Sequence, residues 1–239
     1  MQHTNLFAPN LLPPWEIAVL LVPILAACGY WALYAAQDQP SWPRSLLKTT
    51  ATAGLVLAGA ILADPSLALI LVGLAFGAAG DFALSRRGEP AFLAGMAAFA
   101  LGHLAYAVAM AQRAAHLGGF AIGAGQITTL CGLFALLAST ELWLKPHTST
   151  LRWPVRGYVL VIGLMAAATI ALPPHGGRAV IWSGAALFVL SDLLLAIEIF
   201  IARPPRLKRA LRLTLWPAYW LGQAAILFGA MLYWLDMQG

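Results

Sequence analysis

The sequence predicts an all-α polytopic membrane protein with eight transmembrane helices, folded as a single integral-membrane domain over residues 1–239. Three observations lead to this prediction. Of the 239 residues, 61% are hydrophobic and only 10% are charged, whereas soluble domains usually carry roughly 25% charged residues. Apolar runs long enough to cross a bilayer recur along the whole chain. The basic residues gather in every second loop between those runs.

The apolar runs mark eight expected spans, close in length to the roughly 17–25 residues that a transmembrane helix needs. Turn-forming residues separate several of them, as in Asp64-Pro65 after the second span and in residues 86–90, 173–177 and 204–205 after the third, sixth and seventh. The expected spans are about 14–35, 46–63, 66–84, 90–111, 120–142, 154–172, 177–201 and 213–235.

The loop charges predict the orientation of the chain. The loops after spans 1, 3, 5 and 7, with the span ends beside them, carry 12 of the 14 Lys and Arg residues, and the opposite loops carry Arg113 and Arg178. Because cytoplasmic loops are rich in Lys and Arg, both termini are expected outside, in a bacterial-type inner membrane. This bias accounts for the net charge of +5 without a nucleic-acid partner. The lipid bilayer is the expected partner, and the oligomeric state is left open.

A weak internal repeat relates the two halves of the chain. Gly-Asp-x-x-Leu at residues 80–84 corresponds to Ser-Asp-x-x-Leu at residues 191–195, and Leu-Gly-His at residues 101–103 corresponds to Leu-Gly-Gln at residues 221–223. The order is the same in both halves. Four spans in each half would make a 4+4 parallel repeat, which places corresponding residues at similar depths in the membrane.

Asp81 and Asp192 lie inside the expected third and seventh spans. An ionisable group at membrane depth costs several kcal/mol or more, so such residues usually have a function. We therefore expect both aspartates to be catalytic.

Other polar residues of the spans fall in the same band near the cytoplasmic side, counted at about 1.5 Å per helical residue. They also have structural interpretations: some could hydrogen-bond neighbouring helices, and the lysine could extend to the interface. Glu141 and Glu198, near cytoplasmic span ends, are expected to be solvated. The expected substrate-binding residues are Lys48, His103, Tyr106, Ser191, Tyr219 and Gln223.

Motifs of soluble hydrolases and nucleotide-binding proteins are absent, including G-x-S-x-G, H-E-x-x-H and the P-loop. Only His103 lies well inside a span, which argues against a multi-histidine metal site. Two carboxylates with one histidine could still hold one metal ion, and the sequence leaves that open. We expect no cofactor. The small residues Gly73, Gly77 and Gly80 are typical of a helix-packing surface.

Four motifs follow one another along the chain: Gly80-Asp81-x-x-Leu84, the stretch from Phe92 to Tyr106 that contains Gly102-His103, the stretch Ser191-Asp192-x-Leu194 that continues to Phe200, and Tyr219-x-x-x-Gln223. Together they resemble the YhhN family, the lysoplasmalogenase family of eight-span membrane proteins. The resemblance covers the whole chain, including the Lys48 that opens the second span. One departure is Ile199, at a position where family members usually carry a basic residue.

The resemblance implies hydrolysis of the vinyl-ether bond of a lysoplasmalogen, a lysophospholipid, to a fatty aldehyde and glycerophosphoethanolamine or glycerophosphocholine. Vinyl ethers are labile to acid, because protonation of the β-carbon gives an oxocarbenium ion that water then attacks. Glycosidases solve a similar problem with two carboxyl groups. By that analogy Asp192, the deeper residue, is the expected general acid. Asp81 is the expected ionised partner, and the reverse assignment stays open.

Two other classes of function remain compatible with these residues. A transporter or flippase for a lipid or small amphiphile would suit a parallel repeat with acids near the midplane. A membrane hydrolase of another lysolipid, cleaving a different ether, ester or amide, would use the same acids. A scaffold protein fits least well, because it gives the buried acids no task. Turnover by purified protein in detergent, without a gradient, separates the hydrolases from a transporter.

Overall fold

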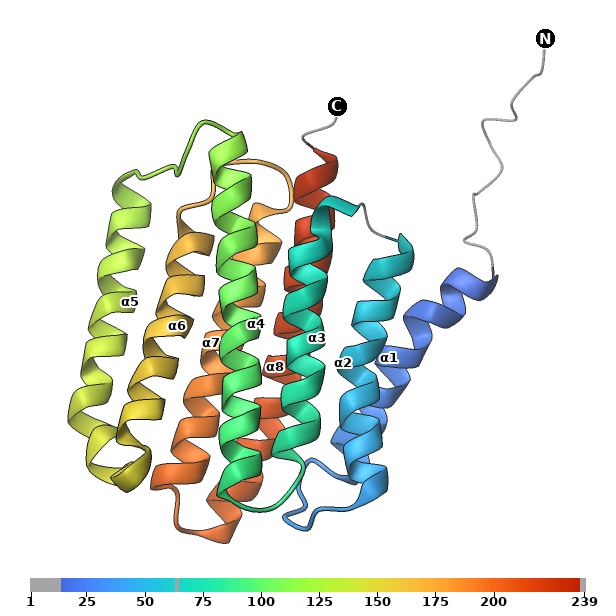
Figure 1. Cartoon of the computed structure of the whole chain (residues 1–239), viewed down its shortest axis with the longest axis vertical. Coiled ribbons are helices and arrows are strands. Elements are labelled where there is room, and N and C mark those ends of the chain that lie inside the picture. Colours follow the sequence, from blue (N-terminus) through green and yellow to red (C-terminus); the bar gives the residue numbers. More distant parts are fainter. Residues whose placement is uncertain (1–13, 63–64, 237–239) are drawn as a thin grey trace.

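The computed structural model describes residues 14–62 and 65–236, and these residues form eight α-helices without a β-strand (Figure 1). The all-α fold class predicted from the sequence is confirmed. Asp64, expected in a turn, lies outside the described residues. The helices are α1 (Pro14–Leu33), α2 (Trp42–Leu62), α3 (Ala68–Leu84), α4 (Glu89–His116), α5 (Ala124–Trp143), α6 (Arg152–Ile170), α7 (Arg178–Ala196) and α8 (Pro205–Leu235).

Within the described residues, six helices are long and apolar enough to cross a membrane: α2, α4, α5, α6, α7 and α8. The apolar helices Ile17–Leu33 and Ala68–Leu84 are shorter. At 1.5 Å per residue a helix of 17 residues, such as α3, is about 26 Å long. This is slightly less than the roughly 30 Å hydrocarbon core of a bilayer. The six long apolar helices indicate an integral membrane protein. Because the other two apolar helices are shorter, the count of eight spans stays a prediction.

Two helices begin earlier than the expected spans. Helix α8 begins at Pro205 instead of residue 213, and α2 begins at Trp42 instead of residue 46. The expected boundaries followed hydropathy, which ends where basic residues begin, but Lys and Arg are good helix formers. Proline is also well placed in a first helical turn, where its missing N–H has no intrahelical acceptor. The basic first turns of both helices therefore extend beyond the apolar segments.

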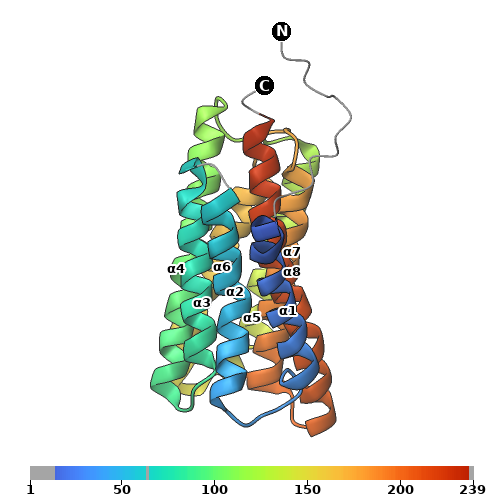
Figure 2. The same ribbon diagram turned by 90° about the vertical axis from the view of Figure 1, so that its right-hand side faces the viewer.

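The helices form a bundle in which sequence neighbours run antiparallel (Figures 1 and 2). Helices α3 and α4 pair closely, as do α7 and α8, and α8 also packs against α1, α2 and α3. Helix α4 packs against α6 across the bundle. Helix α5 lies at the edge, packs chiefly against α6, and has no buried residue. The centre of the bundle therefore lies among α3, α4, α7 and α8.

The loops after α1, α3, α5 and α7 all lie at the lower end of the bundle in Figure 1. Together with the helix ends beside them, they carry 12 of the 14 Lys and Arg residues, so we call this end the basic end. The structure thus agrees with the predicted segregation of charge. That the basic end faces the cytoplasm stays a prediction from the positive-inside rule.

Glycines allow the central helices to approach closely. A Cβ atom on Gly184 of α7 would lie 2.7 Å from the backbone nitrogen of Ile226 and 2.8 Å from the carbonyl oxygen of Gly222, both on α8. Residues 73, 77 and 80 of α3, expected as a packing surface, are in close contact with side chains of α4 and α8. Gly73 and Gly80 accommodate the rings of Tyr106 and Phe99, and Gly77 accommodates the amide of Gln223.

Replacing Gly184 by alanine should destabilise the α7–α8 pair, because the new methyl group would meet backbone atoms that cannot rotate away. We expect a loss of about 1–3 kcal/mol, the usual range for overpacking. Thermal unfolding of the detergent-solubilised protein would measure it.

The matched control is Gly157→Ala in α6, where a Cβ atom would have no neighbour within 4 Å. Since alanine favours helix over glycine, this variant should unfold at the same temperature as the wild type or a higher one. Equal unfolding temperatures for both variants would show that the α7–α8 contact does not need a glycine.

Candidate active site

Asp81 is fully buried in α3 and is held by side chains from two other helices. The Lys48 ammonium lies 3.1 Å from Oδ1 of Asp81. The hydroxyls of Thr52 and Tyr219 donate hydrogen bonds to Oδ2, at 2.7 and 2.8 Å. Lys48 and Thr52 are one helical turn apart on α2, so both side chains reach the same face. We call these four residues the Asp81 cluster, in which one cation and two hydroxyl donors surround a carboxyl group.

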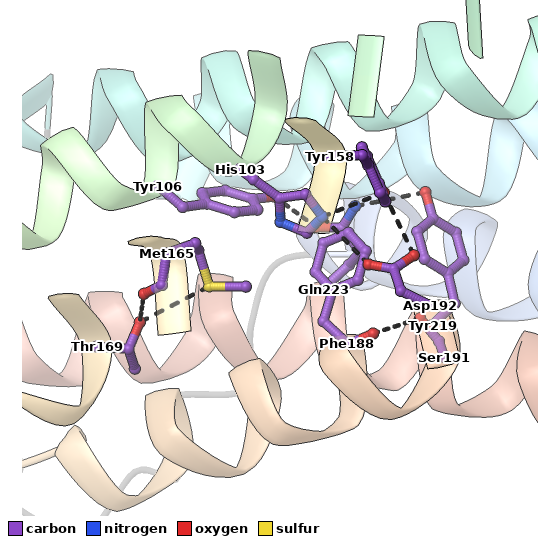
Figure 3. A network of polar contacts seen from close by, with 10 residues as sticks. All are labelled: His103, Tyr106, Tyr158, Met165, Thr169, Phe188, Ser191, Asp192, Tyr219 and Gln223. Atoms are coloured by element: carbon purple, nitrogen blue, oxygen red, sulfur yellow. Dashed lines mark hydrogen bonds and ion pairs between the residues drawn. The ribbon is translucent and has the colours of Figure 1, made fainter. Parts of the chain in front are cut away.

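Asp192 on α7 is the centre of a second group, the Asp192 cluster, with His103 of α4 and Tyr158 of α6 (Figure 3). His103 Nε2 lies 3.2 Å from Asp192 Oδ2. The Tyr158 hydroxyl lies 3.3 Å from Asp192 Oδ1, to which it donates, and 3.3 Å from His103 Nε2. The His103 side chain is fully buried, whereas that of Asp192 keeps 11% of its surface exposed. This cluster therefore joins an acid that is still accessible to an enclosed imidazole.

The two aspartates have equivalent helical surroundings. Asp81 contacts the preceding helix, α2, and α8, the last helix of the other half of the chain. Asp192 contacts its own preceding helix, α6, and α4, the last helix of the first half. This exchange between halves is what a 4+4 parallel repeat would produce. The repeat itself stays a prediction.

An aromatic layer lies between the two clusters. The Phe188 ring packs 4.5 Å from the His103 ring and 5.5 Å from the Tyr219 ring, and Phe99 packs edge-on against both Phe188 and Tyr219. In the part of the chain that the structure describes, no hydrogen bond joins the two carboxyl groups directly. Any joint action of the two acids therefore has to pass across these rings.

An apolar cavity opens beside the Asp192 cluster. It lies between α4, α5, α6 and α7, and Asp192 and Tyr158 are the polar side chains of its lining that belong to the cluster. A second pocket at the basic end is polar, and Lys48 of the Asp81 cluster is part of its lining. The cavity and the pocket share one wall and are therefore adjacent. The residues that line both are Leu84, Phe92, Leu195 and Ile199.

The predicted site residues are thus distributed over the two clusters. Lys48 and Tyr219 contact Asp81, and His103 contacts Asp192. Gln223 donates a hydrogen bond to the Tyr219 hydroxyl and accepts one from Tyr106, so Gln223 lies one hydrogen bond and Tyr106 two hydrogen bonds away from the Asp81 cluster.

Ser191 is buried and donates its hydroxyl to the Phe188 carbonyl oxygen on its own helix, at 2.7 Å. The roles of these residues in substrate binding stay predictions.

Sequence reasoning missed two members of the clusters, Thr52 and Tyr158. Thr52 lies four residues after Lys48, so a search for polar side chains on the same helix face would have found it. Tyr158 carries a hydroxyl about one helical turn inside the sixth expected span, where a polar group needs a partner. Nothing in the sequence says which helix supplies that partner.

Glu198 differs from expectation. It was expected to be solvated, but it is only 8% exposed and accepts hydrogen bonds of 3.0 and 2.7 Å from the Arg212 guanidinium. The reason is local: α7 ends in a π-helical turn over Ile197–Ile201, and Glu198 lies in that turn against α8. Wide turns of this kind are frequent at functional sites. Glu141 is 41% exposed beside Arg156 and Lys145, as expected.

Within residues 14–62 and 65–236, no three His, Cys, Asp or Glu side chains group closely enough to hold a metal ion. The polar groups of both clusters instead bond one another. The arrangement can therefore hold a proton on a carboxyl–imidazole pair, at the edge of an apolar cavity, beside a second carboxyl group with a cationic partner.

The model of the YhhN family matches residues 43–230. This range includes both clusters, the apolar cavity and the polar pocket, apart from the pocket residues at the end of α1 and in the loop after it. The chain belongs to the YhhN family. It is 31% identical to the lysoplasmalogenase TMEM86A of Bos taurus over 227 residues, covering 88% of each chain. It is 30% identical to human lysoplasmalogenase TMEM86A, again over 88% of each chain. Against the lysoplasmalogenase TMEM86B of Rattus norvegicus it is 32% identical over 188 residues, or 77% of this chain and 74% of that one. No solved structure matches the chain.

Replacing Lys48 by methionine should destabilise the protein strongly, because it leaves the Asp81 carboxylate buried without a cation. Breaking a buried ion pair by removing one partner typically costs about 3–5 kcal/mol. Thermal unfolding in detergent would measure the loss.

The double variant Lys48→Met with Asp81→Asn is the internal control. It removes the unpaired charge, and it should recover most of the lost unfolding temperature. A double variant as unstable as Lys48→Met alone would mean that the lysine stabilises the bundle by packing instead of by pairing with Asp81.

Proposed function

We propose that this YhhN protein is a membrane-embedded hydrolase that cleaves the vinyl-ether bond of a lysoplasmalogen. The products would be a fatty aldehyde and glycerophosphoethanolamine or glycerophosphocholine. One observation carries the proposal: the Asp192 carboxyl group, bonded to His103, lines an apolar cavity that adjoins a polar pocket. A lysolipid has one hydrocarbon chain and one polar head, and the vinyl ether lies where the two meet. The lysoplasmalogenase relatives support the same substrate class.

In this proposal Asp192 is the general acid. It donates its proton to the β-carbon of the vinyl ether, and the electrons of the double bond leave a positive charge shared by the α-carbon and the ether oxygen. Water then adds to the α-carbon and returns a proton to the Asp192 carboxylate. The resulting hemiacetal collapses to aldehyde and alcohol.

His103 and Tyr158 would orient the acid. Both contact the Asp192 carboxyl group, and the exposed part of that group faces the cavity. When Asp192 has given up its proton, the imidazole and the phenol can each donate a hydrogen bond to the carboxylate. The cluster therefore stabilises the state of the acid that protonation of the substrate creates.

Asp81 would supply the fixed negative charge that the oxocarbenium ion needs. Its three partners, Lys48, Thr52 and Tyr219, place one ammonium group and two hydroxyl donors around its oxygens. The carboxyl group is enclosed, so it would act on the cation electrostatically across the aromatic layer. Charges interact over longer distances in an apolar interior than in water. The reverse assignment, with Asp81 as acid, would require it to be protonated beside an ammonium.

The site would be reached from the cytoplasmic leaflet, if the basic end faces the cytoplasm of a bacterial-type inner membrane. The hydrocarbon chain of the lysolipid would enter sideways near α5, which lines the cavity and packs chiefly against α6. The headgroup would meanwhile stay in the polar pocket.

Detergent-purified protein should release aldehyde from a lysoplasmalogen without any gradient. Asp192→Asn should lower the rate about 10²–10⁴-fold, the usual contribution of a general acid. Asp81→Asn should also lose most activity. A coupled assay that follows oxidation of the aldehyde would measure all three rates.

Asp236→Asn is the matched control, since Asp236 lies at the opposite end of α8 from the basic end and is mostly exposed. Its rate should equal that of the wild type. An active Asp192→Asn variant would refute the acid assignment. Folded wild-type protein that releases no aldehyde would refute the vinyl-ether hydrolase and favour a different lysolipid substrate or transport.

A further inference from the structure

The polar pocket at the basic end carries more positive charge than the Asp81 cluster uses. Its lining includes five basic and two acidic side chains. The basic residues are Arg44, Lys48, Arg86, Arg87 and Arg212, and the acidic residues are Asp38 and Glu198.

Three of these basic side chains already have partners. Arg212 pairs with both acidic residues of the pocket. Lys48 pairs with Asp81. Arg87 donates a hydrogen bond to the side-chain oxygen of Gln39.

Arg44 and Arg86 remain. Neither makes an ion pair with a residue of the described segments, and buried nitrogens of both guanidinium groups have no hydrogen-bond partner there: Nε of Arg44, and Nε and Nη2 of Arg86. An unpaired buried donor is costly, so it needs an explanation, and a bound anion is one that fits a guanidinium group. These two side chains therefore supply the positive charge of the pocket that is free to bind an anion.

Aromatic rings hold the two guanidinium groups in place. The Arg86 guanidinium carbon lies 3.9 Å from the ring centre of Trp42 and 4.6 Å from that of Phe82. The Arg44 guanidinium carbon lies 6.0 Å from the ring centre of Tyr30. A guanidinium that rests on an aromatic face can still form hydrogen bonds in its own plane. Both groups are thus positioned before any ligand arrives.

We propose that Arg44 and Arg86 bind the phosphate group of a lysophospholipid head. Arginine forms paired hydrogen bonds with phosphate oxygens, and two such groups can bind the two non-bridging oxygens that share the negative charge of a phosphodiester. Both acidic residues of the pocket pair with Arg212, which offsets one of their two negative charges, and the pocket lining as a whole keeps a net positive charge. Lys48, an expected substrate-binding residue, pairs with Asp81, and its role in substrate binding stays a prediction.

The adjacent apolar cavity makes this anion site a lipid site. The pocket and the cavity share the wall formed by Leu84, Phe92, Leu195 and Ile199. A phosphate held by the two arginines leaves the hydrocarbon chain of the same molecule beside the cavity that Asp192 lines. The lysophospholipid as substrate comes from the proposed function, on which this assignment rests. Binding of the phosphate group does not itself require a vinyl ether or the proposed reaction.

The test uses a lysolipid that cannot be cleaved, 1-O-hexadecyl-glycerophosphocholine, whose ether is saturated. Its dissociation constant for full-length protein in detergent can be followed by tryptophan fluorescence, since Trp42 lies beside Arg86. Arg44→Gln and Arg86→Gln should each weaken binding about tenfold or more, the effect of losing a hydrogen bond between charged groups. The phosphate-free analogue 1-O-hexadecylglycerol should bind wild type and variants equally.

Arg206→Gln is the matched control, because Arg206 is an exposed arginine at the same end and does not line the pocket. It should bind both ligands like the wild type. Equal affinity of the wild type and the Arg44→Gln, Arg86→Gln double variant for the phospholipid analogue would overturn the proposal. So would inorganic phosphate that displaces the analogue at equal concentration, since the pocket would then take free phosphate.

Aldehyde release separates this proposal from the proposed function. Loss of analogue binding in the arginine variants, in a protein that releases no aldehyde, would support the phosphate site and refute the reaction. Aldehyde release with an unchanged KM in the double variant would support the reaction and refute the phosphate site.

Discussion

Buried charge is the constraint on which the rest of this structure depends. A carboxyl group inside an apolar bundle is stable only when donors or a cation reach it, and no helix can supply them all from its own surface. Asp81 therefore contacts Lys48 and Thr52 of α2 and Tyr219 of α8. The partners of Asp192 lie on α4 and α6. These contacts tie together six of the eight helices in the described part of the chain.

Small residues make those contacts possible. Tyr219 and Gln223 can approach Asp81 because Gly77 of α3 leaves room for both side chains, and Phe99 fits against Gly80. The close approach of α7 and α8 at Gly184 and its neighbours fixes the position of Phe188 between the clusters. In a membrane, where lipid is as apolar as leucine, such close packing provides much of the attraction between helices. The glycines thus help to position the polar side chains of the two clusters, although they have no reactive side chain themselves.

The two compartments beside the acids differ in polarity. The apolar cavity is lined mainly by apolar side chains, while the polar pocket at the basic end is rich in arginine. Asp192 lies on the first and Lys48 on the second, with four apolar residues shared between them. In the proposed function, this contrast would orient a substrate with one hydrocarbon chain and one charged head. The π-helical turn at Ile197–Ile201 contributes to both compartments and, through Glu198, is anchored to Arg212.

The sequence by itself determined the class of protein, the helical segments and the two acids, because hydropathy and intramembrane charge are local properties of the chain. It also predicted that basic residues would gather at one end. It did not determine where α2 and α8 begin, since hydropathy reports apolar length and not helix length. Nor did it reveal that Thr52 and Tyr158 complete the clusters, that Glu198 is buried, or that Lys48 is occupied by Asp81. Those facts depend on which helix faces which. Helix pairing is decided by packing between residues far apart in the chain, so only the tertiary structure could supply it.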